Sequence, residues 1–502
     1  MTVVLPESAA ESEASGHAPP LPPRRVSARV QFYAQTALLT LLFASPAILC
    51  LHSAFVADND VWWHLRTGQW ILQHHAVPHK EPYSVLAGMP WAAYSWLFEV
   101  IIYGLFHWLG LTGLLVYSSG MVLLVVICLY RMISRVQPDF ILASLLTFAA
   151  MFSMGHLFTP RPWMFTILLF VLELDILMSA RRTGQKTGLL WLPAIFILWA
   201  NTHIQFVDGL FILGLAFAES VLARWWKGAQ RGPGAVWLGL ALAGSIAGTL
   251  LNPYGWRLYA VAHDLATQSG ALNLITELQA IPFRSPPDYV VLLLAMGAVA
   301  ALARHNKLLS FDGALLAFAI LLSFRSQRDV WVTAAVAAII LASSIETSEG
   351  RTTKPGRMTF AAASVGALLI VCAGFRMWHL NNKALESGID QVFPAEAAQQ
   401  VAARQIQGPV YSTFNWGGYL IWSIRQPVMI DGRQNVYGDQ RMDRSVATWS
   451  GEPGWSTDPA LNSAGVVIGP VKAPLVQLLR TNPHFRDVYE DKVAVVFVPQ
   501  RP

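Results

Sequence analysis

The sequence contains few charged residues. Only 13% of its 502 residues are Asp, Glu, Lys or Arg, whereas a typical soluble domain carries about 25%. Apolar runs of about 20 residues, each long enough to cross a bilayer, recur through the first three quarters of the chain. The mean hydropathy is +0.44, so the composition excludes an ordinary soluble enzyme and predicts a polytopic helical membrane protein. The net charge of +5 does not indicate a nucleic-acid partner, because the basic residues cluster in loops between the apolar runs.

Cysteine is scarce as well. The chain has three cysteines, Cys50, Cys128 and Cys372, and each lies inside an apolar run. They are predicted to be small buried hydrophobic residues, which excludes a disulfide framework and a cysteine-based metal site.

The positions of Lys and Arg predict how the chain crosses the membrane, because short loops rich in these residues stay in the cytoplasm. Residues 1–29, rich in Ala, Ser, Glu and Pro, are predicted to form a disordered cytoplasmic tail. With this tail inside, basic clusters such as Arg181, Arg182 and Lys186 all fall on the cytoplasmic side. About eleven spans are predicted, at residues 32–51, 112–130, 140–157, 163–180, 189–206, 209–223, 235–251, 289–303, 309–324, 330–345 and 359–378.

One further apolar segment, residues 96–110, is about 15 residues long, which is short for a span. If it crossed the membrane, every later loop would change sides and the basic clusters would lie outside. It is therefore predicted to be a helix on, or dipping into, the outer face of the membrane.

The fold class predicted is an all-α polytopic membrane domain at residues 30–382, with a first outer loop at 54–111, followed by a small extracytoplasmic α/β domain at 383–502. In this last part, apolar stretches of strand and helix character alternate. Strands are predicted at 409–414, 427–432 and 464–469 and a hairpin at 485–499, with helices after Pro394 and at 417–424 and 473–481.

The stretch "DNDVWWHLRTGQWILQHH", residues 58–75, follows the first apolar run and is rich in polar and aromatic side chains. Asp58 and Asp60 lie at the membrane surface, and a helix is predicted from about Val61. The other predicted outer loops supply cationic or titratable side chains that could line the same cavity: His156, Arg161, His203, Arg257, Arg325 and Arg328.

A carboxylate beside cations at a membrane surface suits glycosyl transfer from a lipid-linked sugar phosphate. A base must deprotonate the acceptor hydroxyl, and cations must stabilise the departing phosphate. The transition state is oxocarbenium-like, and one carboxylate on the far face of the sugar suffices for inversion.

The motifs "DNDVWWHLRTGQWI", "VPHKEPYS" and "WLFEV", with "WGGYLIW", "IDGR" and "YG" near the C-terminus, resemble a set of bacterial membrane proteins. This set is related to the GT-C superfamily of polyprenyl-phosphate-dependent glycosyltransferases, which includes protein mannosyltransferases, aminoarabinose transferases and oligosaccharyltransferases. The resemblance covers the first loop and the C-terminal domain. It implies a location in the bacterial inner membrane, a polyprenyl-phosphate sugar donor, and a glycan, lipid or protein acceptor.

The resemblance also implies roles for individual residues. Asp58 and Asp60 match the acids that act as base or metal ligand, and Glu81 stands where the set usually has Asp. Trp63, His64 and Arg66 of the same loop are further candidates for substrate binding. No metal site is assigned, and no cofactor is implied with certainty, although the carboxylate pair could hold Mg²⁺ or Mn²⁺ if the donor carried a pyrophosphate.

Simpler interpretations stay open. Asp58 and Asp60 could only cap a helix, the tryptophans could only anchor the loop at the membrane interface, and Arg161 could only bond helix-end carbonyls. The "DGR" at 431–433 could be a strand-to-loop turn rather than a substrate contact. Two other functional classes compete with the transferase: a lipid or glycan transporter, and a non-catalytic protein of envelope assembly.

Overall fold

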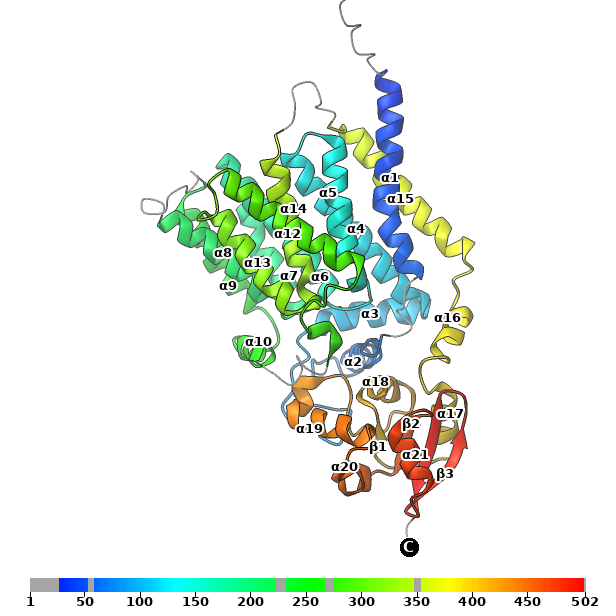
Figure 1. The fold of residues 1–502 in the computed structure, drawn as a ribbon. Helices are drawn as coiled ribbons and strands as arrows, with labels where there is room; N and C mark the ends of the chain where they lie inside the picture. The colour runs from blue at the N-terminus through cyan, green and yellow to red at the C-terminus, as the bar shows by residue number, and fades with distance from the viewer. Residues whose placement is uncertain (1–26, 53–57, 223–231, 268–274, 347–353, 501–502) are drawn as a thin grey trace, which may run out of the picture.

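The computed structural model describes residues 27–52, 58–222, 232–267, 275–346 and 354–500. Long helices form a bundle, and a smaller part with strands lies beyond one end of it (Figure 1). The bundle helices are α1 (Ala28–His52), α4 (Thr112–Val136), α5 (Phe140–Ser153), α6 (Trp163–Thr183), α7 (Leu192–Thr202), α8 (Phe206–Val221), α9 (Ala235–Thr249), α12 (Pro286–Arg304), α13 (Phe311–Arg325), α14 (Val330–Ser344) and α15 (Arg357–Met377).

Each of the eleven predicted spans coincides with one of these helices. Five helices within the described ranges are long and apolar enough to cross a membrane. Others, such as α5 and α9, have 14 and 15 residues. The helical membrane domain is therefore confirmed, whereas the count of eleven spans stays a prediction. The five helices long and apolar enough to cross a membrane are Ala28–Leu51, Thr112–Val136, Trp163–Thr183, Pro286–Arg304 and Arg357–Met377.

Two helices of the first loop lie between the bundle and the C-terminal part. These are α2 (Val61–His74) and α3 (Trp96–Leu109). In Figure 1, α3 lies across the bundle rather than parallel to its helices, as the sequence predicts for a helix at the membrane surface. The two helices pack closely because Gly68 has no side chain: a Cβ there would lie 2.1 Å from the carbonyl oxygen of Glu99.

The C-terminal part contains a four-stranded sheet of order β1-β2-β4-β3. β1 is parallel to β2, whereas β2 and β3 are both antiparallel to β4. The predicted α/β character is thus confirmed. The strands are β1 (Val410–Ser412), β2 (Val466–Pro470), β3 (Phe485–Glu490) and β4 (Ala494–Pro499), and the helices are α16 (Asn382–Ile389), α17 (Ala395–Ala403), α18 (Phe414–Ser423), α19 (Gln434–Trp449), α20 (Pro459–Asn462) and α21 (Pro474–Arg480).

The first loop is joined to this sheet through its edge. Val428 makes isolated parallel bridges with Val410 on one side and with Ser84 of the first loop on the other. The predicted strand at 427–432 is therefore wrong apart from this one residue. After Met429 the chain leaves the sheet edge, because Asp431 and Arg433 are buried in an ionic cluster with the loop.

Ion pairs connect helices toward the other end of the bundle. Arg135 near the C-terminal end of α4 pairs with Asp175 of α6 at 2.6 Å, and Arg181 of α6 pairs with Glu219 of α8. These pairs lie toward the C-terminal end of α6, whereas the polar cluster described below lies at its N-terminal end. They therefore hold helices together at a distance from the candidate site.

Substitution of two glycines by alanine tests the packing of α2 on α3. Both Gly68→Ala and Gly104→Ala gain helix propensity of about 1 kcal/mol. A Cβ at 104 meets no atom within 4 Å, whereas one at 68 meets the backbone of Glu99. We expect Gly68→Ala to be less stable than Gly104→Ala by about 1–3 kcal/mol, measured by thermal unfolding in detergent. Equal stability of the two variants would show that α3 moves aside freely.

Candidate functional site

The carboxylate pair of the first loop is bound by Arg161, which lies just before the start of α6. Asp58 accepts hydrogen bonds through Oδ1 from the backbone N–H groups of Asp60 and Val61, at 3.0 and 3.1 Å. Its Oδ2 accepts from Nε of Arg161 at 2.6 Å, and Nη1 of Arg161 donates to Asp60. Asp58 therefore bonds the backbone N–H groups at the start of α2 and also makes an ion pair. Asp60 stands at the N-cap position but makes no side-chain cap hydrogen bond, so capping alone describes neither aspartate.

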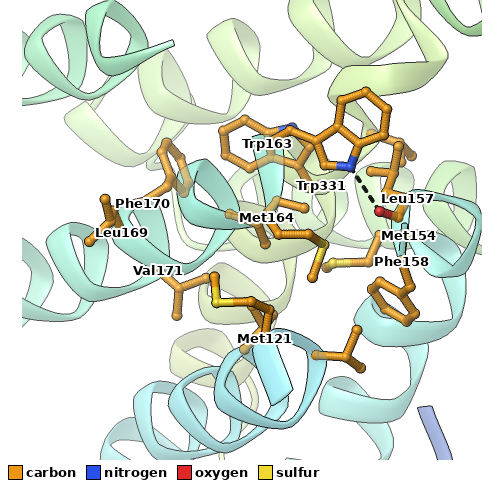
Figure 2. Close-up of a cluster of buried hydrophobic side chains, with 14 of the residues drawn as sticks. Met121, Met154, Leu157, Phe158, Trp163, Met164, Leu169, Phe170, Val171 and Trp331 are labelled. Carbon is orange, nitrogen blue, oxygen red and sulfur yellow. Dashed lines mark hydrogen bonds between the residues drawn. The ribbon is translucent and has the colours of Figure 1, made fainter. Parts of the chain in front are cut away.

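Arg161 is held firmly in this position. It stands between Pro160 and Pro162, and its carbonyl oxygen accepts a hydrogen bond from the Tyr117 hydroxyl at 3.0 Å. Its guanidinium lies 5.1 Å from the ring centre of Trp163. Nε1 of Trp163 donates in turn to the carbonyl of Leu157 at 2.8 Å, and this bond borders a cluster of buried apolar side chains (Figure 2).

Burial and charge act in opposite directions on this triad. Burial raises the pKa of Asp58, and the adjacent Arg161 partly offsets that rise. Burial by itself lowers the pKa of Arg161, but Asp58 and Asp60 outweigh it and raise the pKa above its usual value. Arg161 therefore remains a cation between the two carboxyl groups.

A second buried pair lies beside the triad. Nδ1 of His64 and Oε1 of Glu99 are 3.1 Å apart, and both side chains are almost fully buried. Burial lowers the pKa of His64 well below its usual value, and burial raises the pKa of Glu99 well above its own. Burial therefore favours the neutral imidazole and the neutral carboxyl group in this hydrogen bond.

The C-terminal part supplies a third ionic cluster. Arg433 donates through Nη2 to Glu81 of the first loop and to Asp431, both at 2.7 Å, and the Tyr437 hydroxyl donates to Asp431 at 2.6 Å. The guanidinium also lies about 5 Å from the ring of Trp91. Among the described residues, no group accepts a hydrogen bond from Nη1 of Arg433.

Two glycines bring this C-terminal part against the start of α2. A Cβ on Gly432 would lie 2.0 Å from Oδ1 of Asp60, and one on Gly418 would lie 2.7 Å from the carbonyl oxygen of Asn59. Side chains at these positions would push the two parts of the site apart. The "WGG" and "DGR" motifs therefore act together with the distant "DND" motif.

These elements enclose a polar cavity of about 100 Å³. A second cavity of about 210 Å³ shares several walls with it, among them Tyr94, His203 and Arg328. A third, of about 580 Å³, shares Trp91, Ala92 and Asn435 with the first. Four regions line the first cavity. The first loop contributes Asp60, Trp63, His64, Trp91, Ala92, Ala93, Tyr94, Ser95 and Glu99, and the start of α6 contributes Arg161, Pro162 and Trp163. Later loops and α10, which spans Arg257–Thr267, contribute His203, Leu265, Ile275, Glu277, Leu278 and Arg328, and the C-terminal part contributes Gly432, Arg433, Gln434 and Asn435.

Most of the residues singled out in the sequence meet here. Six of them line the first cavity, and Asp58 lies directly behind it, bonded to Arg161. Arg325 lines the adjoining second cavity and Arg257 lines the third. The six are Asp60, Trp63, His64, Arg161, His203 and Arg328.

Three candidates do not line these cavities. Arg66 donates to Gln69 on its own helix at 2.6 Å, and Nε2 of His156 lies 3.2 Å from the carbonyl oxygen of Gln327. Glu81 is 1% exposed and is bound by Arg433 and by the backbone of Tyr83 and Ser84. Glu81 therefore holds the loop to the C-terminal part instead of facing a ligand.

Glu99 and Arg433 are two charged or titratable lining residues that the sequence analysis did not single out. Glu99 is part of the "WLFEV" motif, but nothing in that motif shows that it pairs with His64. Arg433 is part of "DGR". This motif was interpreted as a turn, so the Arg433 side chain was not proposed as part of the site. The signal available in the sequence was an arginine in a short polar stretch between two apolar segments.

The carboxylate pair does not fit a divalent cation as it stands. Arg161 already bridges the two carboxyl groups. Within the described ranges, no three His, Cys, Asp or Glu side chains form a group that could hold a metal ion. A divalent ion bound by carboxylates would also lie next to the guanidinium charge.

Comparison of the sequence with known protein families finds no matching family model, and no curated protein matches it either. Solved structures do match the fold. The archaeal oligosaccharyltransferase AglB from Archaeoglobus fulgidus, in complex with an inhibitory peptide and a dolichol-phosphate, has a TM-score of 0.58 at 12% identity, over 88% of this chain and 70% of that chain.

A second structure of the Archaeoglobus fulgidus oligosaccharyltransferase, complexed with Zn and sulfate, has a TM-score of 0.53 at 12% identity, over 93% of this chain and 73% of that chain. The fold is of the GT-C type. ArnT from Cupriavidus metallidurans, bound to undecaprenyl phosphate, has a TM-score of 0.45 at 13% identity, over 94% and 98% of the two chains. At these identities the likeness concerns the fold and not the reaction.

Removal of the Arg433 guanidinium tests whether it joins the two parts of the site. Arg433→Met would leave Glu81 and Asp431 buried without their cation, and such a loss costs about 3–5 kcal/mol. We expect a large fall in the unfolding temperature and faster proteolysis at the junction between the first loop and α19. The exposed Arg486→Met is the control, and equal stability of both variants would contradict the proposed joint.

Replacement of Glu99 by Gln tests the neutral His64–Glu99 pair. The pKa of Glu99 is raised in the folded chain. Its contribution to the free energy of unfolding is therefore complete below the unfolded pKa of about 4.3 and decreases as the pH rises. Glu99→Gln cannot lose a proton, so we expect its unfolding temperature to fall less than that of the wild type between about pH 5 and 8. Parallel curves for the two proteins would contradict the raised pKa.

Proposed function

We propose that this protein is a membrane glycosyltransferase that moves a sugar from a polyprenyl-phosphate donor to an acceptor hydroxyl or amide. The observation that carries the proposal is the cavity at the bundle end, where the Asp60 carboxylate faces a space lined by Arg161, Arg328 and Arg433. It combines a base with cations that can stabilise a leaving phosphate. The GT-C-type fold supports it, because AglB was solved with a dolichol-phosphate.

The geometry suggests different roles for the two aspartates. Asp60 lines the cavity and its side chain is 20% exposed, whereas Asp58 is 4% exposed and lies behind Arg161. Asp60 is therefore the proposed base, which takes the proton from the acceptor as the acceptor atom attacks the anomeric carbon. The bond from that carbon to the phosphate oxygen breaks, and polyprenyl phosphate leaves. Asp58 is a positioning residue, because it orients Arg161 and begins α2.

The arginines are proposed to receive the phosphate. Nη1 of Arg433 and Nε of Arg328 are buried atoms with no partner among the described residues. Guanidinium groups form strong, charge-assisted hydrogen bonds with phosphate oxygens. Binding of the phosphate would therefore satisfy donors that the protein itself leaves unpaired.

The same proposal includes the arrangement in the cell. The α1 N-terminus would lie in the cytoplasm, and the cavity and the C-terminal part would lie on the outer face of the bacterial inner membrane. The distribution of Lys and Arg supports this orientation. Donor and acceptor would then meet at the outer surface, with the acceptor being a glycan, a lipid or a protein.

Conversion of Asp60 to Asn tests the reaction. Loss of a general base lowers a rate by about 10²–10⁴-fold, so we expect a lipid-linked sugar to accumulate and one surface glycan modification to disappear in cells that carry Asp60→Asn. Mass spectrometry of extracted lipids and of surface glycans measures both. The control is Asp443→Asn, an exposed residue on the far half of α19.

The same comparison separates the competing classes. If Asp60→Asn is expressed at the wild-type level and both lipids and glycans are unchanged, while deletion of the protein alters the envelope, the transferase proposal is wrong. A transporter would leave the sugar on its lipid but shift the lipid from one face of the membrane to the other.

A further inference from the structure

The pair Asp58 and Asp60 has the sequence form of a divalent-cation site, yet most of its oxygen atoms are already occupied. Both oxygens of Asp58 accept hydrogen bonds, from two backbone N–H groups and from Arg161. Oδ2 of Asp60 accepts from the same guanidinium, which leaves Oδ1 of Asp60 as the one oxygen of the pair without a hydrogen bond among the described residues. A metal ion that bridged the two carboxylates could therefore enter only by displacing Arg161.

Displacement of Arg161 would disturb several contacts at once. Its side chain is 12% exposed and is enclosed by both carboxylates and the Trp163 ring, while its backbone carbonyl is held by the Tyr117 hydroxyl. A guanidinium is always charged and its planar fork matches two carboxylates. Withdrawal of the side chain would therefore break both ion pairs and the contact with the Trp163 ring.

The surrounding residues do not complete a metal site. Glu277 adds one more carboxylate to the cavity lining, but no three His, Cys, Asp or Glu side chains in the described part of the chain form a group that could hold a metal ion. His64 and Glu99, on α2 and α3, are bonded to each other. Hard cations such as Mg²⁺ require several oxygen ligands in fixed geometry, and Arg161 already takes the position between the two aspartates.

We infer that the guanidinium of Arg161 takes the place of a divalent cation between Asp58 and Asp60, and that the centre binds a lipid-linked monophosphate without metal. The lipid as the source of the phosphate rests on the proposed function. The metal-free character rests on the hydrogen bonds of Arg161 alone.

The restriction to one phosphate follows from how the charge is neutralised. Carboxylate sites commonly bind pyrophosphate groups through a shared Mg²⁺ ion that contacts both partners. Here the unpaired donors are nitrogens, Nη1 of Arg433 and Nε of Arg328. Two such donors match the oxygens of a single phosphate, whereas the second phosphate of a pyrophosphate adds a charge that would have to be met without a bridging Mg²⁺ ion as long as Arg161 stays between Asp58 and Asp60.

Manganese binding measured by electron paramagnetic resonance tests the first half of this inference. We expect the purified wild-type protein to bind no Mn²⁺ at concentrations up to about 1 mM, and Arg161→Met to acquire a site that Asp60→Asn in the same chain removes. Arg161→Lys is the conservative variant: its ammonium keeps a positive charge beside the two carboxylates without the planar fork of the guanidinium, so we expect it to acquire no Mn²⁺ site. A wild-type site tighter than about 100 μM that Asp60→Asn abolishes would overturn the inference.

Lipid binding by the wild-type protein tests the restriction to one phosphate. This test does not depend on whether a variant folds. Binding of a short-chain polyprenyl monophosphate and of the corresponding diphosphate is measured in EDTA and in Mn²⁺. We expect the monophosphate affinity to change by less than about twofold between the two conditions and the diphosphate to bind at least about tenfold more weakly in EDTA. The exposed Arg441→Met should bind both lipids as the wild type does.

The outcomes separate this inference from the proposed function. Sugar transfer that is abolished by EDTA and restored by Mn²⁺ would overturn the metal-free centre and leave the transferase proposal standing. Equal binding of the two lipids in EDTA would overturn the restriction to one phosphate. Failure of either lipid to bind under both conditions would overturn that restriction and also remove the donor from the proposed function.

Discussion

The structure depends on the buried guanidinium of Arg433, which lies between a carboxylate of the first loop and a carboxylate of the C-terminal part. Glu81 and Arg433 are 352 positions apart in sequence, and neither is exposed to water. A buried carboxylate without a cation would be strongly destabilising. The ion pair therefore holds the first loop and the C-terminal part together in the folded protein. The edge bridges of Val428 with Ser84 and Val410 add backbone pairing to the same contact. The C-terminal part is therefore a wall of the candidate site and not an appendage.

Arg161, which lines the same cavity, has a similar role. It connects the entrance of α6 with the start of α2, so the bundle and the first loop share one ionic centre. Each of the two arginines is matched with two carboxylates, and at least one of these comes from a segment distant in sequence. The cavity between them is thus defined by charge pairs rather than by the shape of one element. This arrangement places a carboxylate and unpaired guanidinium nitrogens together in a site shielded from bulk water, where electrostatic interactions are strong.

The glycines of the site are explained by close approach. Gly432 and Gly418 leave space for Asp60 and for the backbone of Asn59, and Gly68 leaves space for α3. At each position a single carbon atom would collide with a backbone or a carboxylate that the ionic clusters hold in place. The motifs "DND", "WGG" and "DGR" are therefore parts of one contact, although the sequence separates them widely.

The sequence by itself determined the helical membrane domain, the small α/β part and the short helix at 96–109, and most of the residues that it singled out lie at the cavities. Hydropathy and the period of apolar residues follow local rules, so they are visible in one dimension. Only the tertiary structure decided that Arg161 pairs with Asp58 and Asp60, that Glu81 is bound to Arg433, and that Arg66 and His156 lie apart from the cavity. These outcomes depend on partners far away in the chain, and no local pattern specifies which buried carboxylate a distant arginine will meet.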